Sequence, residues 1–306
     1  MTGRLRGISA VSERVVWASG AGGTVIRTED GGTSWKALRV PDAETLDFRD
    51  VDAVDERTAY VLSIGHGDAS RIYKTTDAGA TWVLQFRNED SKAFFDAMVF
   101  SDRRTGFALS DAVDGQLVLS RTTDGARWSR VLAKDLPPAL AGEGAYAASG
   151  TNLAIQGDSI WFGTTASRVI RSTDRGVTWT AASTPLPSGT SAGIFSIAFR
   201  DRLHGIVVGG DYKKENEAID NAAVSADGGA TWALVKGLGG FRSAVAFIPS
   251  SNVVVAVGPS GSDYSTDGAR TWQPIDGPGF HTLSVAPGSR HAWAGGENGT
   301  VARIEF

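Results

Sequence analysis

The stretch that decides the fold is Thr28-Glu29-Asp30-Gly31-Gly32-Thr33-Ser34-Trp35. Its serine or threonine, aspartate, glycine and tryptophan return at the same spacing further along the chain. These later copies are Thr75-Thr76-Asp77-Ala78-Gly79-Ala80-Thr81-Trp82, Ser172-Thr173-Asp174-Arg175-Gly176-Val177-Thr178-Trp179 and Ser225-Ala226-Asp227-Gly228-Gly229-Ala230-Thr231-Trp232. Two imperfect copies centre on Asp124 and Asp267. A motif that recurs in this way indicates a chain built from equivalent structural units.

The spacing of the copies identifies the unit. The aspartates stand at positions 30, 77, 124, 174, 227 and 267, at intervals of 47, 47, 50, 53 and 40 residues. This is the period of a four-stranded propeller blade. A seventh unit lacks the aspartate, but its residues 293–303 mirror residues 17–27. We therefore predict an all-β, seven-bladed β-propeller, a single domain over residues 1–306, with blades at about 5–40, 46–88, 94–132, 145–182, 193–236, 241–275 and 281–306.

Alternation and turn signals predict the strands of the first blade at residues 5–11, 15–19, 24–28 and 34–40. The motif then falls between the third and fourth strand of each blade. Such an aspartate accepts backbone N–H groups in a tight turn. We predict this structural role for Asp30, Asp77, Asp124, Asp174, Asp227 and Asp267. Because the seventh blade ends in its third strand, its fourth is expected from residues before Leu5, or from a leader that has been cut away.

Composition excludes several function classes. The net charge is −4 and no basic block stands out, so nucleic acid is not an expected partner. The chain has no cysteine, which rules out disulfides and thiolate metal sites; no metal and no cofactor is predicted. No apolar run approaches the ~20 residues of a membrane span. We expect a periplasmic or secreted protein if a leader was removed, and a cytoplasmic protein otherwise.

The two faces of the predicted ring differ in their loops. The long connections, including residues 87–92, 132–144, 183–192 and 211–221, fall on the face opposite the aspartate turns. Long loops on a rigid scaffold commonly carry binding sites. The polar residues predicted for this loop-rich face are His66, Asp68, Asp111, Asp114, Glu143, Asp211, Tyr212, Lys213 and Lys214. They are either a solvated surface or the lining of a cleft.

A second pattern appears where the first strand of each blade begins. Arg6, Arg49, Arg242 and His281 occupy equivalent positions when the repeats are aligned, and Phe95-Asp96 and Phe195-Ser196 fill the same positions in two other blades. The innermost strands line the channel, so these four side chains are predicted to form a cationic arc that binds an acidic group at its mouth. The alternative is that carboxylates from adjacent blades neutralise each arginine.

The motif S/T-x-D-x-G-x-x-W resembles the Asp box of the BNR repeat family. Residues 5–11, Leu-Arg-Gly-Ile-Ser-Ala-Val, and residues 17–20, Trp-Ala-Ser-Gly, resemble the photosystem II stability/assembly factor-like group within it. That resemblance covers most of the chain and implies a non-catalytic scaffold that holds a partner protein. The oxidoreductase description attached to some relatives has no support here, because the chain has neither a dinucleotide-binding glycine motif nor a cysteine.

Asp-box propellers also include carbohydrate-active enzymes, which keeps a second function class open. Glycoside hydrolysis needs two carboxylates, for which Asp111, Asp114, Glu143 and Asp211 are the candidates. A lyase could use His66 or His281 with Tyr212. The nearest string to the sialidase motif, residues 247–249, Phe-Ile-Pro, lacks its arginine. The residues leave open whether the chain is an enzyme, and the ligand is either a protein partner or an acidic small molecule or saccharide.

Overall fold

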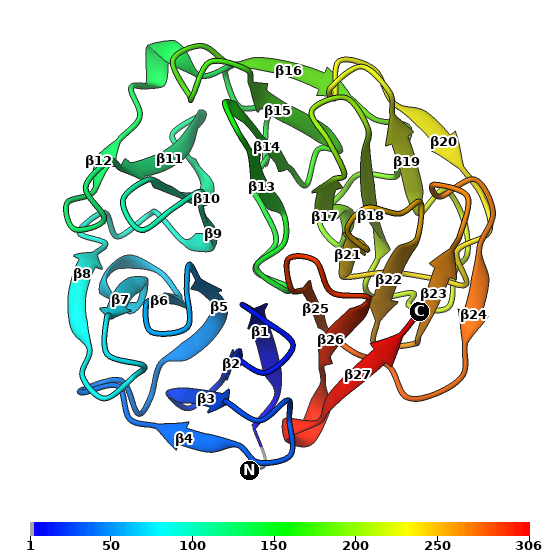
Figure 1. Cartoon of the computed structure of the whole chain (residues 1–306). Coiled ribbons are helices and arrows are strands. Elements are labelled where there is room, and N and C mark those ends of the chain that lie inside the picture. Colours follow the sequence, from blue (N-terminus) through cyan, green and yellow to red (C-terminus); the bar gives the residue numbers. More distant parts are fainter. Residues whose placement is uncertain (1–2) are drawn as a thin grey trace.

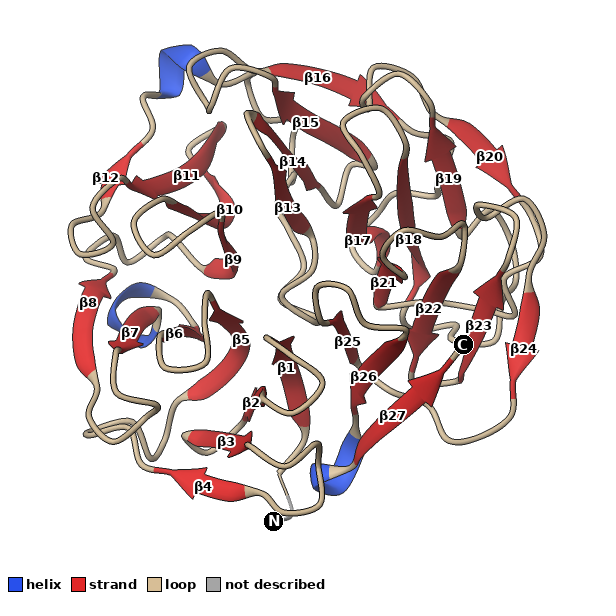
Figure 2. Cartoon of the chain, in the orientation of Figure 1, coloured by secondary structure: helices blue, strands red, loops and turns tan. Residues whose placement is uncertain are grey.

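The computed structural model describes residues 3–306 as a ring of antiparallel sheets (Figures 1 and 2). Blade one contains β1 (Leu5–Ala10), β2 (Val16–Gly20), β3 (Thr24–Thr28) and β4 (Lys36–Leu38). Blade two contains β5 (Asp47–Ala53), β6 (Ala59–Ile64), β7 (Arg71–Thr75) and β8 (Val83–Arg87). Blade three contains β9 (Phe95–Phe100), β10 (Gly106–Val113), β11 (Gln116–Thr122) and β12 (Ser129–Arg130).

The remaining blades continue around the ring in chain order (Figure 1). Blade four contains β13 (Leu153–Gln156), β14 (Ser159–Gly163), β15 (Arg168–Ser172) and β16 (Thr180–Ser183). Blade five contains β17 (Ala192–Phe199), β18 (Gly205–Asp211), β19 (Ala222–Ser225) and β20 (Ala233–Val235). Blade six contains β21 (Ala244–Phe247), β22 (Val254–Gly258), β23 (Gly261–Ser265) and β24 (Gln273–Ile275). Blade seven contains β25 (Thr282–Val285), β26 (His291–Gly295) and β27 (Val301–Glu305).

The predicted all-β, seven-bladed propeller is confirmed. Within residues 3–306, helix is limited to three single turns, η1 (Gly67–Ala69), η2 (Ala133–Asp135) and η3 (Glu297–Gly299). Blade seven has three strands within the described residues, and β27 forms its outer edge. The predicted fourth strand from before Leu5 partly concerns residues 1 and 2, which lie outside the described residues. Gly3 and Arg4 are not in a strand, while Leu5 N–H donates to Gly296 O at 2.9 Å and thereby joins blade one to blade seven.

Side chains on the innermost strands join adjacent blades. Ser284 on β25 accepts the N–H of Ala10 on β1 at 3.0 Å, and Ser9 on β1 accepts the N–H of Ala53 on β5 at 3.0 Å. Asp52 on β5 accepts the N–H of Phe100 on β9 at 2.6 Å. The side chain at this position of the repeat thus accepts a backbone N–H of the following blade. Such a bond is needed because a buried N–H without an acceptor is costly.

Tryptophans pack between the blades further from the axis. Trp82, which ends the aspartate motif of blade two, lies edge-on to Trp17 of blade one, with ring centroids 6.2 Å apart. Trp35 of blade one meets Trp293 of blade seven at the same centroid distance. Trp17 is fully buried and Trp293 nearly so. Each of these contacts covers a hydrophobic face that one blade could not bury alone.

The aspartate turns lie between the third and fourth strands, as predicted. In blade two, Asp77 accepts hydrogen bonds from Thr81 Oγ1 at 2.6 Å, Thr81 N at 2.9 Å and Thr75 Oγ1 at 2.8 Å. Thr75 Oγ1 in turn accepts the N–H of Gly79 at 2.9 Å. These bonds, led by the one from the Thr81 hydroxyl, lower the pKa of Asp77 to about 2. The carboxylate is therefore the centre of the turn.

Replacing Asp77 by alanine is expected to lower the melting temperature by roughly 2–6 °C, because it removes three hydrogen bonds at once. Thermal unfolding followed by circular dichroism measures the change. Asp68→Ala is the matched control, since this exposed carboxylate of the same blade has Arg71 Nη2, at 3.4 Å, as its one partner among the described residues. Equal melting temperatures for Asp77→Ala and wild type would exclude a structural role for the turn.

Candidate functional site at the channel mouth

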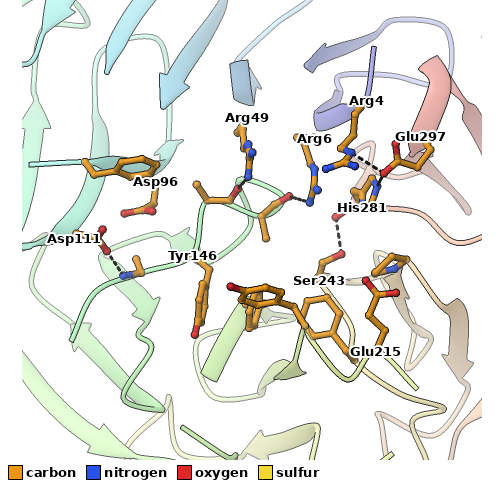
Figure 3. A pocket seen from close by; sticks show the side chains of 18 residues that line it. Arg4, Arg6, Arg49, Asp96, Asp111, Tyr146, Glu215, Ser243, His281 and Glu297 are labelled. Carbon is orange, nitrogen blue, oxygen red and sulfur yellow. Dashed lines mark hydrogen bonds and ion pairs between the residues drawn. The ribbon is translucent and has the colours of Figure 1, made fainter. Parts of the chain in front are cut away.

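A cavity of about 780 Å³ opens at the centre of the loop-rich face (Figure 3). It is bounded by the beginnings of the innermost strands and by the loops that join second to third strands. The polar residues that line it are Arg4, Arg6, Arg49, Asp96, Asp111, Tyr146, Tyr212, Glu215, Ser243, His281 and Glu297. The apolar residues are Phe94, Ala145, Ala147, Ala148, Phe195, Phe241 and Pro259. Such a volume suits a small ligand or a few residues of a peptide.

A recurrent irregularity in the first strand of a blade points side chains into this cavity. The pairing of β1 with β2 shifts at Arg6, and that of β5 with β6 shifts at Arg49. The pairing of β9 with β10 shifts at Asp96, and that of β17 with β18 at Phe195. An extra residue in one strand of a pair is left out of the ladder and turned aside. All four of these residues line the mouth, so in blade five the position belongs to Phe195 rather than to Ser196.

Arg6 and Arg49, two residues of the predicted arc, line the cavity and form a cationic wall. Arg6 Nη1 lies 3.4 Å from Ala148 O, and Arg49 Nη1 donates to Ala147 O at 3.0 Å. Arg49 Nε also pairs with Asp47 at 2.8 Å. Burial lowers the pKa of Arg6 to about 10, assisted by the charges of Arg49 and Arg4. Two like charges held side by side in a cavity create an attractive site for an anion.

His281 adjoins this wall but does not add the predicted positive charge. Burial, and then the charge of Arg6, lower its pKa to about 4, so the imidazole is neutral near pH 7. Its Nε2 lies 2.7 Å from Glu297 Oε1, which assigns the ring proton to Nε2. Glu297 also pairs with Arg4 Nε at 2.6 Å. Arg4, which the sequence analysis did not single out, supplies the third guanidinium of the cationic wall.

The expected place of Arg242 in the arc is corrected by the structure. Arg242 is 3% exposed and buried against Asp263, with Nε 2.6 Å from Oδ2. Its backbone N–H donates to the preceding blade, as that of Phe280 does, while the N–H of Ser243 bonds within its own blade, as that of His281 does. Blade six is therefore displaced by one residue from the sequence alignment. Such a slip turns each side chain to the opposite side, so Ser243 faces the mouth in place of Arg242.

Residues 145–152, which precede β13, cross the channel and form the floor of the cavity. Ser149 Oγ donates to Ser243 O of blade six at 2.7 Å, and Thr282 Oγ1 of blade seven donates to Ser149 O at 3.0 Å. The bonds from Arg6 and Arg49 join the same segment to blades one and two. The cavity is thus a closed-bottomed pocket rather than an open channel. The sequence predicts residues 145–152 in the body of blade four and gives no indication of this floor.

Two carboxyl groups form a second wall beside the arginines (Figure 3). Burial, and then the neighbouring Asp111, raise the pKa of Asp96 well above its ordinary value. Burial also raises the pKa of Asp111, whose Oδ1 accepts the N–H of Ala145 at 2.8 Å. Asp96 is 1% exposed. Its equivalence to Arg6 and Arg49 in the aligned repeats was the signal that placed it at the mouth.

Aromatic rings close the remaining side. Tyr146 stacks on Phe195 with ring centroids 3.8 Å apart and planes 7° apart. Tyr212 meets both rings edge-on, and Phe241 packs against Phe195 with centroids 4.6 Å apart. Tyr212 was predicted for this face, whereas Tyr146 was not. An aromatic wall binds apolar groups and the faces of sugar rings.

Several candidate residues lie away from the pocket. Glu143 is a buried structural group, because it pairs with Arg168 and accepts a hydrogen bond from Thr164 Oγ1 at 2.7 Å. Asp114 pairs with Lys92 at 2.8 Å on the surface. The others are exposed or partly exposed on the loop-rich face: His66, Asp68, Asp211, Lys213 and Lys214. Of the six catalytic candidates, the structure brings Asp111 and Tyr212 into the pocket.

Across residues 3–306, no three histidine, aspartate or glutamate side chains are grouped so as to hold a metal ion. In the same part of the chain, none of the helices has the length and apolar character needed to cross a membrane.

Comparison with known proteins gives matches of fold. No protein-family model matches the sequence, and no curated protein matches it. YCF48 bound to a D1 peptide superimposes with a TM-score of 0.70 at 18% identity, over 100% of this chain and 94% of that one. YCF48 from Cyanidioschyzon merolae gives 0.69 at 16% identity, over 99% and 96% of the two chains. The GH74 xyloglucanase from Xanthomonas campestris gives 0.67 at 14% identity, over 99% of this chain and 52% of the enzyme. At such identities the likeness establishes that the chain has the seven-bladed propeller fold that these proteins share.

Proposed function

We propose that this chain is a non-catalytic binding protein that holds a carboxylate-bearing partner chain or an acidic small ligand in the mouth pocket. The observation that carries the proposal is the cationic wall of Arg4, Arg6 and Arg49 on the loop-rich face. Guanidinium groups recognise carboxylates through a planar pair of donors. The solved YCF48 complex, which has a D1 peptide bound to a propeller of this fold, supports a peptide as one such ligand.

The arginines retain binding capacity despite their internal contacts. Within residues 3–306, Arg6 Nε has no hydrogen-bond partner although it is buried. Arg49 donates to Ala147 O but is also paired with Asp47, as Arg4 is with Glu297. Within the same residues Arg6 has no carboxylate partner, and its contact with Ala148 is to a neutral carbonyl oxygen. A carbonyl orients a guanidinium without cancelling its charge. Burial has already removed water from Arg6, which lowers its pKa. The charge of a bound carboxylate compensates for this lost hydration and therefore favours binding.

A second candidate function is a carbohydrate-active enzyme, which the Asp96 and Asp111 pair favours. Both carboxyl groups have raised pKa values in one pocket, and such shifts are common among catalytic acids. Aromatic rings for stacking sugars lie beside them. A glycoside hydrolase is the version to test, with Asp111 and Asp96 as the acid and base. Release of reducing sugar ends from xyloglucan or a uronate polymer by wild type, lost in Asp111→Asn, would replace the binding proposal.

The binding proposal predicts that Arg6→Ala combined with Arg49→Ala weakens the binding of acidic peptides at least about tenfold, since two charge-assisted contacts are lost. The measurement is isothermal titration calorimetry with peptides that end in a free carboxylate and with the same peptides amidated. Arg39→Ala combined with Arg175→Ala is the matched control, because both arginines are exposed and paired elsewhere. Equal affinity of the folded pocket variant and wild type would overturn the proposal.

A further inference from the structure

The charge of the mouth changes sign between two neighbouring blades. Arg49 of blade two and Asp96 of blade three occupy the same irregular position of their inner strands. The charge of Arg49 acts on the carboxyl of Asp96, opposing the rise of its pKa. Figure 3 shows Asp96 and Asp111 on the side of the cavity next to Arg49, with Arg6 beyond it. A ligand that fills this cavity therefore meets cationic and acidic groups side by side.

One carboxyl oxygen of Asp96 lacks a hydrogen-bond donor among the described residues. Its Oδ2 is buried and has no partner within residues 3–306. Asp50, a buried carboxyl of the preceding blade, shows the usual arrangement, because its Oδ2 accepts the N–H of Met98 at 2.6 Å. A buried polar atom without a partner is costly. Asp96 instead lines the cavity, where a ligand is the available source of a donor.

The third feature of the pocket is apolar. The stacked rings of Tyr146 and Phe195 bound the cavity together with Tyr212 and Phe241. The two charged walls do not suit an apolar part of a ligand, whereas the uncharged rings do. The three sides together call for a ligand with an acidic group, a donor group close to it and an apolar body.

On the basis of the proposed function, we infer that the mouth pocket selects a zwitterion: a carboxylate held by Arg6 and Arg49, a protonated amino group held by Asp96 and Asp111, and an apolar side chain over Tyr146 and Phe195. A free α-amino acid and a short peptide with an unblocked amino group both supply this chemistry. Asp96 is then the residue that separates such ligands from simple acids.

A ligand series on the wild-type protein tests the inference. Phenylalanine, 3-phenylpropionate and phenethylamine share the aromatic body but carry both charged groups, the carboxylate alone or the amine alone. By calorimetry, phenylalanine is expected to bind about tenfold or more tightly than either analogue, because it completes both walls. The dipeptide Phe-Phe, with its amino group free or acetylated, distinguishes a short peptide from a free amino acid. Equal binding of phenylalanine and 3-phenylpropionate would overturn the inference.

Asp96→Asn tests the same assignment from the protein side. This variant keeps the shape of the side chain but loses its charge, and it is expected to bind phenylalanine about tenfold more weakly while binding 3-phenylpropionate as wild type does. Asp114→Asn is the control, since Asp114 is exposed and paired with Lys92. Unchanged phenylalanine affinity in folded Asp96→Asn would overturn the inference.

The outcomes separate this inference from the proposed function. If acids bind through Arg6 and Arg49 and the amino group adds nothing, the zwitterion assignment fails and the acidic-ligand proposal stands. If neither acids, amino acids nor acidic peptides bind, both fail.

Discussion

Arg242→Met is expected to lower the free energy of unfolding by about 3–5 kcal/mol, as measured by urea denaturation. Arg242 and Asp263 are both nearly inaccessible to solvent, and their side chains are joined by Nε and Nη2 contacts to Oδ2 at 2.6 and 2.5 Å. Methionine fills the space of the arginine stem but leaves the Asp263 carboxylate buried without its cation. The loss of that compensation, rather than the loss of volume, accounts for the size of the effect.

The double variant Arg242→Met with Asp263→Leu separates charge from packing. Removing both charges is expected to return the stability close to that of wild type, because an apolar pair carries no desolvation cost. Arg39→Met, which breaks the exposed pair with Glu44, serves as a control and should change stability by less than about 1 kcal/mol. A single variant as stable as wild type would contradict a stabilising role for the buried pair of Arg242 and Asp263.

Gly150→Ala is expected to lower the free energy of unfolding by about 2–5 kcal/mol, because backbone strain and overpacking add together. Gly150 has φ +74°, a conformation that disfavours a side chain. A Cβ there would collide with the carboxyl group of Asp50, which is fixed by its hydrogen bond from Met98 N. Because residue 150 belongs to the pocket floor, binding of acidic ligands should weaken together with stability.

Gly157→Ala isolates the backbone part of this effect. Gly157 has φ +60°, and a Cβ at this position would meet no atom within 4 Å. The expected cost is therefore only about 1–2 kcal/mol. Chemical denaturation of both variants gives the difference. Equal costs at residues 150 and 157 would mean that the floor yields to an added methyl group, contrary to its close contact with Asp50.

The fold could be predicted because the repeat is local. Each aspartate turn is completed within a few residues, as in the contacts of Asp77 with Thr75 and Thr81. Repetition of a local motif at blade spacing then determines the ring. The placing of Arg6 and Arg49 followed from the same logic, since an equivalent position in consecutive blades faces the same axis.

The rest of the site could not be predicted, because it depends on register and on contacts distant in sequence. Arg242 follows a phenylalanine, as Arg49 does. The backbone hydrogen bonds nevertheless show that the repeat of blade six is displaced by one residue from the sequence alignment. His281 is adjacent to the cationic wall, but burial and then the charge of Arg6 lower its pKa to about 4, and neither is visible in the sequence. Residues 145–150, Ala-Tyr-Ala-Ala-Ser-Gly, have no strand alternation, and nothing local predicts that they cross the channel.

The floor of the pocket also affects the order in which parts of the protein fold during synthesis. Arg6 contacts a residue 142 positions later, Ser149 one 94 positions later, and Thr282 one 133 positions earlier. Contacts of such long range form late, because wide loops must close before they contribute. During synthesis, the early blades can assemble while the floor still lacks its partners from blades six and seven. If the pocket binds a ligand as proposed, a growing chain therefore gains this binding site only after blade seven has been translated.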